Sequence, residues 1–266
     1  MIDLYINSSV YVQVILAGCF SWFISTLGAG IVFFFKKVNK NILDGMLGLS
    51  AGVMISASFF SLLNPAINQA EELKMISWIV VSLGFVSGSL LLIGGDKLFN
   101  KYFNKNIKNK TKNIKRTVML FSSITLHNIP EGLAIGVAFG SIMYGIEGAT
   151  LSGALMLTLG IAIQNFPEGT AVSLPLRREN YSRLKSFIYG SLSAVVEPIA
   201  ALIGCILVMY VKNVMPFLLS FAAGAMIYVA ISELIPESQE NKNKNLMSLF
   251  TIIGFVFMMI LDVALG

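Results

Sequence analysis

The sequence predicts an all-α integral membrane protein with eight transmembrane helices in an inverted-repeat (3+2+3) organisation. Apolar residues make up 56% of its 266 residues and charged residues only 12%, whereas soluble domains average about 25% charged residues. A soluble fold of this size could not hide so much apolar surface from water. Apolar runs of membrane length recur along the chain, and short basic loops alternate between them. We therefore expect one membrane domain over residues 1–266.

Eight apolar runs come close to the roughly 20 residues that a helix needs to cross the hydrocarbon. They cover residues 10–35, 41–63, 75–95, 117–140, 148–176, 186–211, 214–235 and 246–266. The first run is too long for a cleavable signal peptide, and the residues before it lack the basic segment that such a peptide carries.

Basic residues indicate the orientation of these spans. The first, third, fifth and seventh loops hold 17 of the 19 Lys and Arg residues, and the even loops hold only Lys74 and Lys212. Because Lys and Arg concentrate in cytoplasmic loops, both termini are expected to be extracytoplasmic. The basic residues form no continuous stripe, which argues against nucleic acid as a partner. Richness in Lys, Asn and Ile is typical of an AT-rich bacterial genome, so we expect the cell (inner or plasma) membrane.

The third loop is the most polar part of the chain. Residues 97–116 are rich in Lys and Asn and have few apolar side chains. Such a segment cannot bury enough apolar surface to order itself. We expect a basic cytoplasmic loop between spans three and four, with a short interfacial helix as the alternative.

Two internal echoes indicate an inverted repeat. Residues 127–132 (HNIPEG) recur 37 positions later as residues 164–169 (QNFPEG), and residues 52–63 resemble residues 224–235 more faintly. An odd number of crossings separates the members of each pair, so they run in opposite directions. Transporters with inverted repeats bind their substrates at the repeat interface. Span one would pair with six, two with seven, three with eight, and four with five.

Polar residues gather inside spans four to six, where each ionisable group costs about 2.5–3.5 kcal/mol on insertion scales. They are His127, Asn128, Glu131, Gln164, Asn165, Glu168 and Glu197. Residues three or four apart share a helix face, so each motif presents its polar groups together. Interhelical hydrogen bonding is the alternative role for single polar residues, but the duplicated pattern with a glutamate each time favours a metal pathway.

The ligand chemistry of this cluster is imidazole, carboxylate and amide oxygen without thiolate. That set suits Zn²⁺, and also Cd²⁺, Fe²⁺, Mn²⁺ and Co²⁺, whereas an all-oxygen set would favour Mg²⁺ or Ca²⁺. One or two divalent cations would neutralise the three crowded glutamates. Met54 in span two is a further candidate ligand, with packing as its alternative role. Asp262, near a span end, is expected at the membrane interface.

Proline and glycine accompany the polar motifs. Pro198 has no N–H to bond the carbonyl of Ala194, so we expect a freed carbonyl next to Glu197. Gly132 and Gly169 lack side-chain bulk and are expected to let spans four and five approach each other closely.

The motifs HNIPEG at 127–132 and QNFPEGTAVSLPLR at 164–177, followed by Glu197-Pro198, resemble the ZIP (Zrt-, Irt-like) metal transporters. Gln164 at the head of the second motif and the SLPLR tail are similar to the GufA-like branch. The resemblance implies a transporter rather than an enzyme. It would import zinc and related divalent metals into the cytoplasm, through a binuclear site between spans four and five.

The resemblance also implies how the ligands divide. One metal ion would be held by His127, Glu131, Gln164 and Glu168, with Met54. The second ion would be held by Asn128, Asn165 and Glu197, with Glu131 and Glu168 bridging the two ions. Spans one, four, five and six would move as a block against the other four, and the expected assembly is a homodimer. The chain departs from many members in having Gln164 in place of His and no histidine-rich third loop.

Other function classes fit the sequence less well. An intramembrane hydrolase needs a nucleophile paired with a base, or an HExxH zinc site with an open position. The chain has a single histidine. The Asn and Pro that follow it match neither the pattern of a nucleophile with its base nor that of an HExxH zinc site. A metal-gated channel is the closer rival, and a receptor or scaffold without transport is a more distant one.

Overall fold

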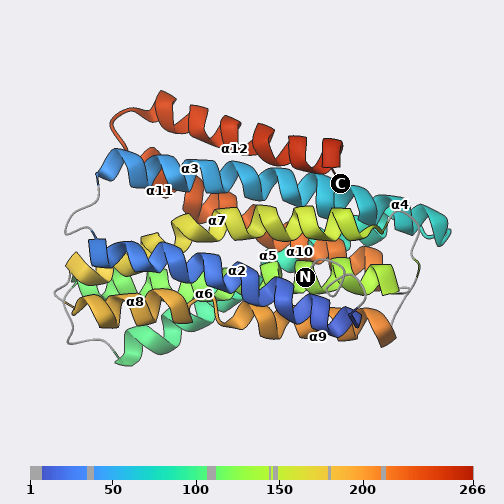
Figure 1. Ribbon diagram of the computed structural model, residues 1–266, viewed down its shortest axis with the longest axis horizontal. Helices are drawn as coiled ribbons and strands as arrows, with labels where there is room; N and C mark the ends of the chain where they lie inside the picture. Colours follow the sequence, from blue (N-terminus) through green and yellow to red (C-terminus); the bar gives the residue numbers. More distant parts are fainter. Residues whose placement is uncertain are drawn as a thin grey trace.

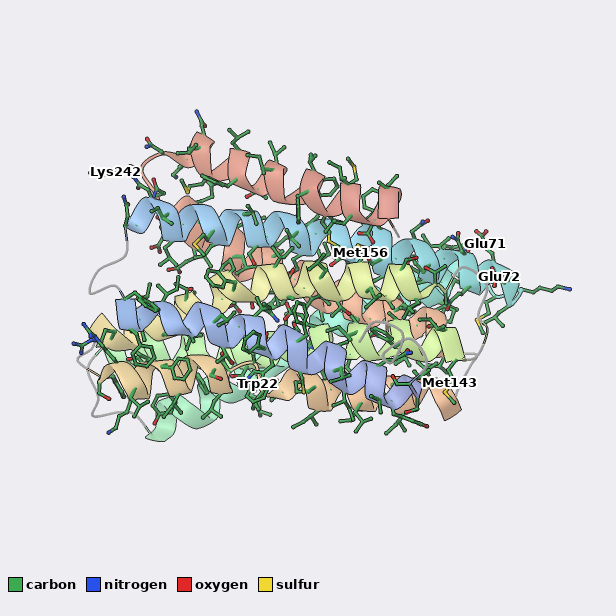
Figure 2. The ribbon with its side chains drawn as sticks, in the orientation of Figure 1. Trp22, Glu71, Glu72, Met143, Met156 and Lys242 are labelled. Atoms are coloured by element: carbon green, nitrogen blue, oxygen red, sulfur yellow. The ribbon has the colours of Figure 1, made fainter. Side chains whose placement is uncertain are left out.

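The computed structural model describes residues 8–34, 39–106, 112–143, 145, 149–178, 181–210 and 214–265. Within these residues the chain forms a bundle of helices along the long axis of the molecule, and the described part contains no strand (Figure 1). Lys242 lies at one end of the bundle, and Glu71 and Glu72 lie at the other end (Figure 2).

Eight helical stretches follow one another in the described residues. The first is α2 (Val10–Phe34), and the second joins α3 (Lys40–Ala57), the π-helical segment η1 (Ser58–Leu63) and α4 (Asn64–Glu72). Next come α5 (Ser77–Asn106), α6 (Lys112–Met143) and α7 (Leu151–Arg178). The sixth stretch consists of α8 (Arg183–Leu192) and α9 (Val196–Tyr210). The seventh joins α10 (Met215–Val229), the π-helical segment η3 (Ala230–Leu234) and α11 (Ile235–Gln239), and α12 (Lys244–Leu265) is the last.

Six of these stretches are long and apolar enough to cross a membrane, counted over the described residues. They start at Val10, Lys40, Ser77, Arg183, Met215 and Lys244. The other two, α6 and α7, contain the polar motifs, which lower their mean hydropathy; only Asn128–Met143 of α6 counts as a shorter apolar helix. The class of all-α membrane protein is confirmed, and eight crossings remain a prediction.

The basic segment at 97–116 differs from the loop expected there. Helix α5 continues to Asn106 and α6 already begins at Lys112, so helix covers this segment except for residues 107–111, which lie outside the described residues. The physical reason is that Lys has a good helix propensity. A polar composition prevents burial in a core, but it does not prevent a membrane helix from continuing into solvent.

The four most extensive helix pairs lie within two groups of helices. Group A consists of α2, α6, α7, α8 and α9, in which α2 packs along α7 and α6 packs along α9. Group B consists of the remaining elements, in which α3 packs along α12 and α5 packs along α10. In Figure 1, α12 and α3 lie side by side at one edge of the bundle, and α9 lies towards the opposite edge.

Group B contains two equivalent close approaches of backbone to backbone. A Cβ added at Gly52 in α3 would lie 1.9 Å from the carbonyl oxygen of Thr251 in α12, and one added at Gly224 in α10 would lie 1.9 Å from that of Phe85 in α5. Gly52 and Gly224 are the residues that the fainter sequence echo pairs. Each is followed in its stretch by a π-helical segment. These matched contacts are the ones that an inverted pairing of span two with seven, and of span three with eight, predicts.

Candidate metal centre

Six of the predicted site residues come together in a buried cluster at the centre of group A. Their side chains are at most 1% exposed, and they project from α6, α7 and α9. They are Asn128, Glu131, Gln164, Asn165, Glu168 and Glu197. A fully buried group of this polarity needs partners, because an unpaired polar atom away from water costs about 1–3 kcal/mol.

Amide groups of α7 bind the carboxylates of the neighbouring helices. The Nε2 atom of Gln164 donates to Oε1 of Glu131 in α6 at 2.5 Å. The Nδ2 atom of Asn165 donates to Oε1 of Glu197 in α9 at 2.9 Å. The two sequence motifs and Glu197, which are far apart in the chain, therefore share one site.

Two serines that the sequence analysis missed complete the outer contacts of the asparagines. Asn165 Nδ2 also donates to Oγ of Ser21 in α2 at 2.8 Å, and Asn128 Nδ2 donates to the carbonyl oxygen of Ser193 at 2.8 Å. Ser21 and Ser193 are 172 residues apart, the same separation as Gly52 and Gly224. This register of the repeat was the signal in the sequence from which both serines could have been found.

Oxygen atoms of the cluster are left without hydrogen-bond donors. These buried atoms are Oδ1 of Asn128, Oε2 of Glu131, Oε1 of Gln164, Oδ1 of Asn165 and Oε2 of Glu197. The amide nitrogens of Asn128, Gln164 and Asn165 all donate to protein acceptors, so the oxygens face the other way. Buried oxygens of this kind are costly unless a donor or a cation meets them. The arrangement can therefore bind cations.

Glu197 lies where the sixth stretch breaks. Helix α8 ends at Leu192, residues 193–195 form a turn, and Glu197 is in the first turn of α9. A carboxylate is stabilised at a helix N-terminus. The expectation that Pro198 leaves the carbonyl of Ala194 free is wrong, because this oxygen accepts the N–H of Glu197 at 3.0 Å. The turn supplies a donor that a continuous helix would lack.

The motif glycines act on other helix pairs than expected. A Cβ added at Gly132 would lie 2.4 Å from the carbonyl oxygen of Glu197 in α9, and one at Gly169 would lie 2.1 Å from that of Ser25 in α2. The sequence analysis predicted that these glycines bring α6 and α7 together, and this prediction is wrong. Instead, Gly132 brings the backbone of Glu197 against α6, next to Glu131, and Gly169 brings α2 against α7.

Helix α3 of group B reaches the cluster through Ser50, a further residue that the sequence analysis missed. The Ser50 hydroxyl is within donor distance of the carbonyl oxygen of Gln164, at 3.2 Å, and of Oε1 of Glu168, at 3.4 Å. Met54 follows Ser50 by four residues, so it shares this face of α3. The signal in the sequence that could have identified Ser50 was its position four residues before Met54, which was already a candidate ligand.

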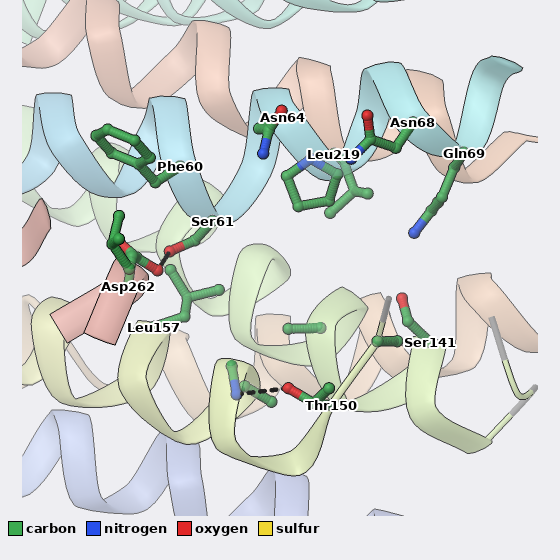
Figure 3. A pocket seen from close by; sticks show the side chains of 16 residues that line it. Phe60, Ser61, Asn64, Asn68, Gln69, Ser141, Thr150, Leu157, Leu219 and Asp262 are labelled. Atoms are coloured by element: carbon green, nitrogen blue, oxygen red, sulfur yellow. Dashed lines mark hydrogen bonds between the residues drawn. The ribbon is translucent and has the colours of Figure 1, made fainter. Parts of the chain in front are cut away.

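A cavity of about 360 Å³ opens at the end of the bundle where α4 lies (Figure 3). Its wall includes Asn64, Asn68 and Asp262, and the Ser61 hydroxyl donates to Oδ1 of Asp262. Asp262 thus lines a cavity. The sequence analysis expected it only at the membrane interface. Leu157, also in the wall, precedes Gln164 by seven residues, which corresponds to about 10 Å along a helix.

Comparison with known proteins shows which family this site belongs to. Residues 110–262, which carry both motifs and Glu197, match the ZIP Zinc transporter family. The chain belongs to this family. It is 36% identical over 340 residues to Zinc transporter ZIP11 of Xenopus tropicalis, with 100% of both chains covered. It is 36% identical over 245 residues to Zinc transporter ZupT of Streptococcus mutans, covering 87% of this chain and 89% of that one.

A third relative is Zinc transporter ZIPB of Bordetella bronchiseptica, which is 34% identical over 262 residues, covering 95% of this chain and 81% of that protein. The resemblance to ZIP transporters seen in the motifs is confirmed, and the chain is a member of a transporter family rather than an enzyme family. The GufA-like branch stays a prediction.

Two predicted ligands of this ZIP protein, His127 and Met54, are not among the six residues of the buried cluster. His127 lies in α6 directly before Asn128, and its side chain falls outside what the structure describes. Met54 is fully buried in the apolar core, so its role as a ligand stays a prediction. The described residues contain no group of three His, Cys, Asp or Glu side chains that could hold a metal ion. A metal ion bound by these residues therefore needs the amide oxygens as well.

Proposed function

We propose that the protein imports zinc and related divalent metal ions into the cytoplasm through a binuclear site between α6 and α7. The observation that carries this proposal is the buried cluster of carboxylates and amides with five oxygen atoms that no donor meets. Membership of a zinc transporter family supports zinc as the substrate, and the mixture of carboxylate and amide oxygens also accepts cadmium, iron, manganese and cobalt.

We propose that the ligands divide between two ions. His127, Glu131, Gln164 and Glu168, with Met54, would hold one ion. Asn128, Asn165 and Glu197 would hold the other, and Glu131 and Glu168 would bridge them. The hydrogen bonds support this division, since Gln164 pairs with Glu131 and Asn165 pairs with Glu197. Three carboxylates leave two divalent ions with little net charge, which permits them in a region that excludes water.

The route into the cluster would start in the cavity at the α4 end. The distribution of basic residues supports an extracytoplasmic position of this end, where Asp262 would attract cations. Along α6 and α7, the buried apolar residues Ala134, Ile135 and Ile161 occupy positions between the residues of the cavity wall and those of the cluster. Their closure favours alternating access over the channel that the sequence left as a rival. A homodimer in the cell membrane, with both termini outside, remains part of the proposal.

Zinc uptake into proteoliposomes tests this function. We expect uptake by the unchanged protein and less than about 1% of that rate in Glu131→Gln and Glu168→Gln, because each variant keeps the side-chain shape but loses a bridging negative charge. Glu72→Gln is the control, since Glu72 is an exposed carboxylate at the end of α4. Accelerated exchange of labelled zinc against internal zinc would support a carrier. Normal uptake in both cluster variants would exclude the proposed site.

A further inference from the structure

The contacts inside the two groups differ from those between them. Inside group A, Trp22 Nε1 donates to the Ser191 carbonyl at 3.0 Å, and Thr170 Oγ1 donates to the Gly28 carbonyl at 2.9 Å. Inside group B, Ser89 Oγ donates to the Gly224 carbonyl at 2.8 Å. Backbones also touch directly within each group, as at Gly169 in group A and Gly52 in group B. Each group is thus held together by hydrogen bonds and by direct contacts between backbones.

Contacts between the groups depend more on side chains. At Gly160 in α7, an added Cβ would meet the sulfur of Met258 in α12 rather than backbone. Methionine is flexible and tolerates displacement of its neighbours. Against this background the hydrogen bonds of Ser50 stand out, because among those described above they alone pass from group B to the metal cluster of group A.

Ser50 is held on a fixed base. Gly52, two residues later in α3, touches the backbone of Thr251 in α12, so this turn of α3 cannot shift without α12. The Ser50 hydroxyl is fully buried and has one hydrogen for two acceptors, the Gln164 carbonyl and the Glu168 carboxylate. Any displacement of α7 along α3 by more than a fraction of a turn must break both contacts.

We propose that Ser50 is a positioning residue that holds the metal site of group A against group B in the arrangement described here, and so sets the balance between the access states of the transporter. This inference rests on the proposed function, because it needs the metal cluster to move with group A. Ser50 is not a metal ligand in this account. Its loss changes how often group A leaves this arrangement and leaves the number of bound ions unchanged.

The test is a disulfide between the groups. Cysteines replace Gly160 and Met258 in a chain whose Cys19 and Cys205 are replaced by Ala, and the fraction cross-linked by copper phenanthroline is measured in vesicles. Removing one buried hydrogen bond shifts an equilibrium by about 2- to 10-fold. We expect Ser50→Ala to lower the cross-linked fraction accordingly, with zinc bound per protomer unchanged. Ser50→Thr keeps the hydroxyl and should cross-link as the Ser50 protein does. Ser50→Val, whose side chain is nearly isosteric with Thr but lacks the hydroxyl, should cross-link as little as Ser50→Ala.

Ser58→Ala is the matched control, because Ser58 is equally buried in the same helical stretch but donates to the Met54 carbonyl of its own stretch at 2.7 Å. It should leave cross-linking unchanged. Equal cross-linking in the Thr and Val variants would overturn the role of Ser50, even where Glu131→Gln still abolishes uptake. Loss of zinc binding in the Ser50 variants would also overturn it, since Ser50 would then be part of the binding site. Failure of the unchanged protein to take up zinc would instead reject the proposed function.

Discussion

Asn165 shows how single side chains define the centre of this protein. Its two hydrogen-bond acceptors, Ser21 Oγ and Glu197 Oε1, lie in two different helices of group A. Because its nitrogen is held in this way, its oxygen is turned away from both and has no hydrogen-bond donor. Orientation of one amide by two neighbours is a form of preorganisation, which spares a binding site the free energy of ordering its ligands.

The sequence was sufficient to predict which polar residues gather in the buried cluster, but not the residues that support them. Glutamates and amides repeated at helical spacing inside apolar runs have few explanations other than a site, so residues such as Glu131 and Glu168 could be singled out. Ser21 and Ser50 had only the weaker signals of repeat register and helical spacing, because serine is common in membrane helices and its partner depends on which helix packs against it. Packing of that kind is a property of the folded bundle.

Glu197 and His127 separate the two proposed ions. Glu197→Ala leaves two carboxylates in the cluster, enough to balance one divalent ion but not two. We expect this variant to bind about one zinc ion per protomer and to keep part of its uptake. His127→Ala removes the imidazole of the other ion and should reduce uptake more strongly. Elemental analysis of purified protein, combined with initial uptake rates, measures both. Two ions bound by the Glu197 variant would contradict the division of ligands.

At the scale of helices, the breaks and close approaches were the least predictable features. Apolar runs located the eight stretches, but they do not reveal η1 and η3, since a π-helical segment changes the register by one residue without altering composition. The partners of Gly132 and Gly169 were assigned to the wrong helices, because a glycine in a sequence indicates a close approach but not the element that approaches.

Gly169 provides a direct test of the packing of α2 on α7. Gly169→Ala would place Cβ 2.1 Å from the Ser25 carbonyl oxygen, a backbone atom that cannot rotate away. We expect destabilisation by about 1–3 kcal/mol, as for other overpacked interiors, and a lower midpoint of thermal unfolding in detergent. Gly94→Ala in α5 is the control, since an added Cβ there meets nothing within 4 Å. Equal midpoints for the two variants would contradict the close contact.

Orientation of the helices can be tested at the two ends of the bundle. Lys242 and Glu72 are exposed and lie at opposite ends (Figure 2). In intact cells, a cysteine at position 72 should react with an impermeant maleimide, and one at position 242 should react only after the membrane is permeabilised, because basic loops face the cytoplasm. The reverse pattern would show that the α4 cavity opens inwards.

For the whole molecule, the two groups would allow the proposed transporter to combine a well-held site with movement. Close backbone contacts keep the cluster of group A intact, and flexible contacts such as that of Gly160 with Met258 separate it from group B. The inverted repeat could be predicted from two echoes in the sequence. The division into groups could not be derived from the residues alone, since it depends on which helices pack against each other. The sequence analysis took it from the family resemblance.

The central claim is that the buried cluster of α6, α7 and α9 holds two divalent cations. Diffraction from crystals grown with zinc, recorded on both sides of the zinc absorption edge, tests it most directly. We predict two anomalous peaks next to Glu131 and Glu168, one on the Gln164 side and one between Asn165 and Glu197. Absence of zinc from this cluster, with peaks only in the cavity beside Asp262, would contradict the account.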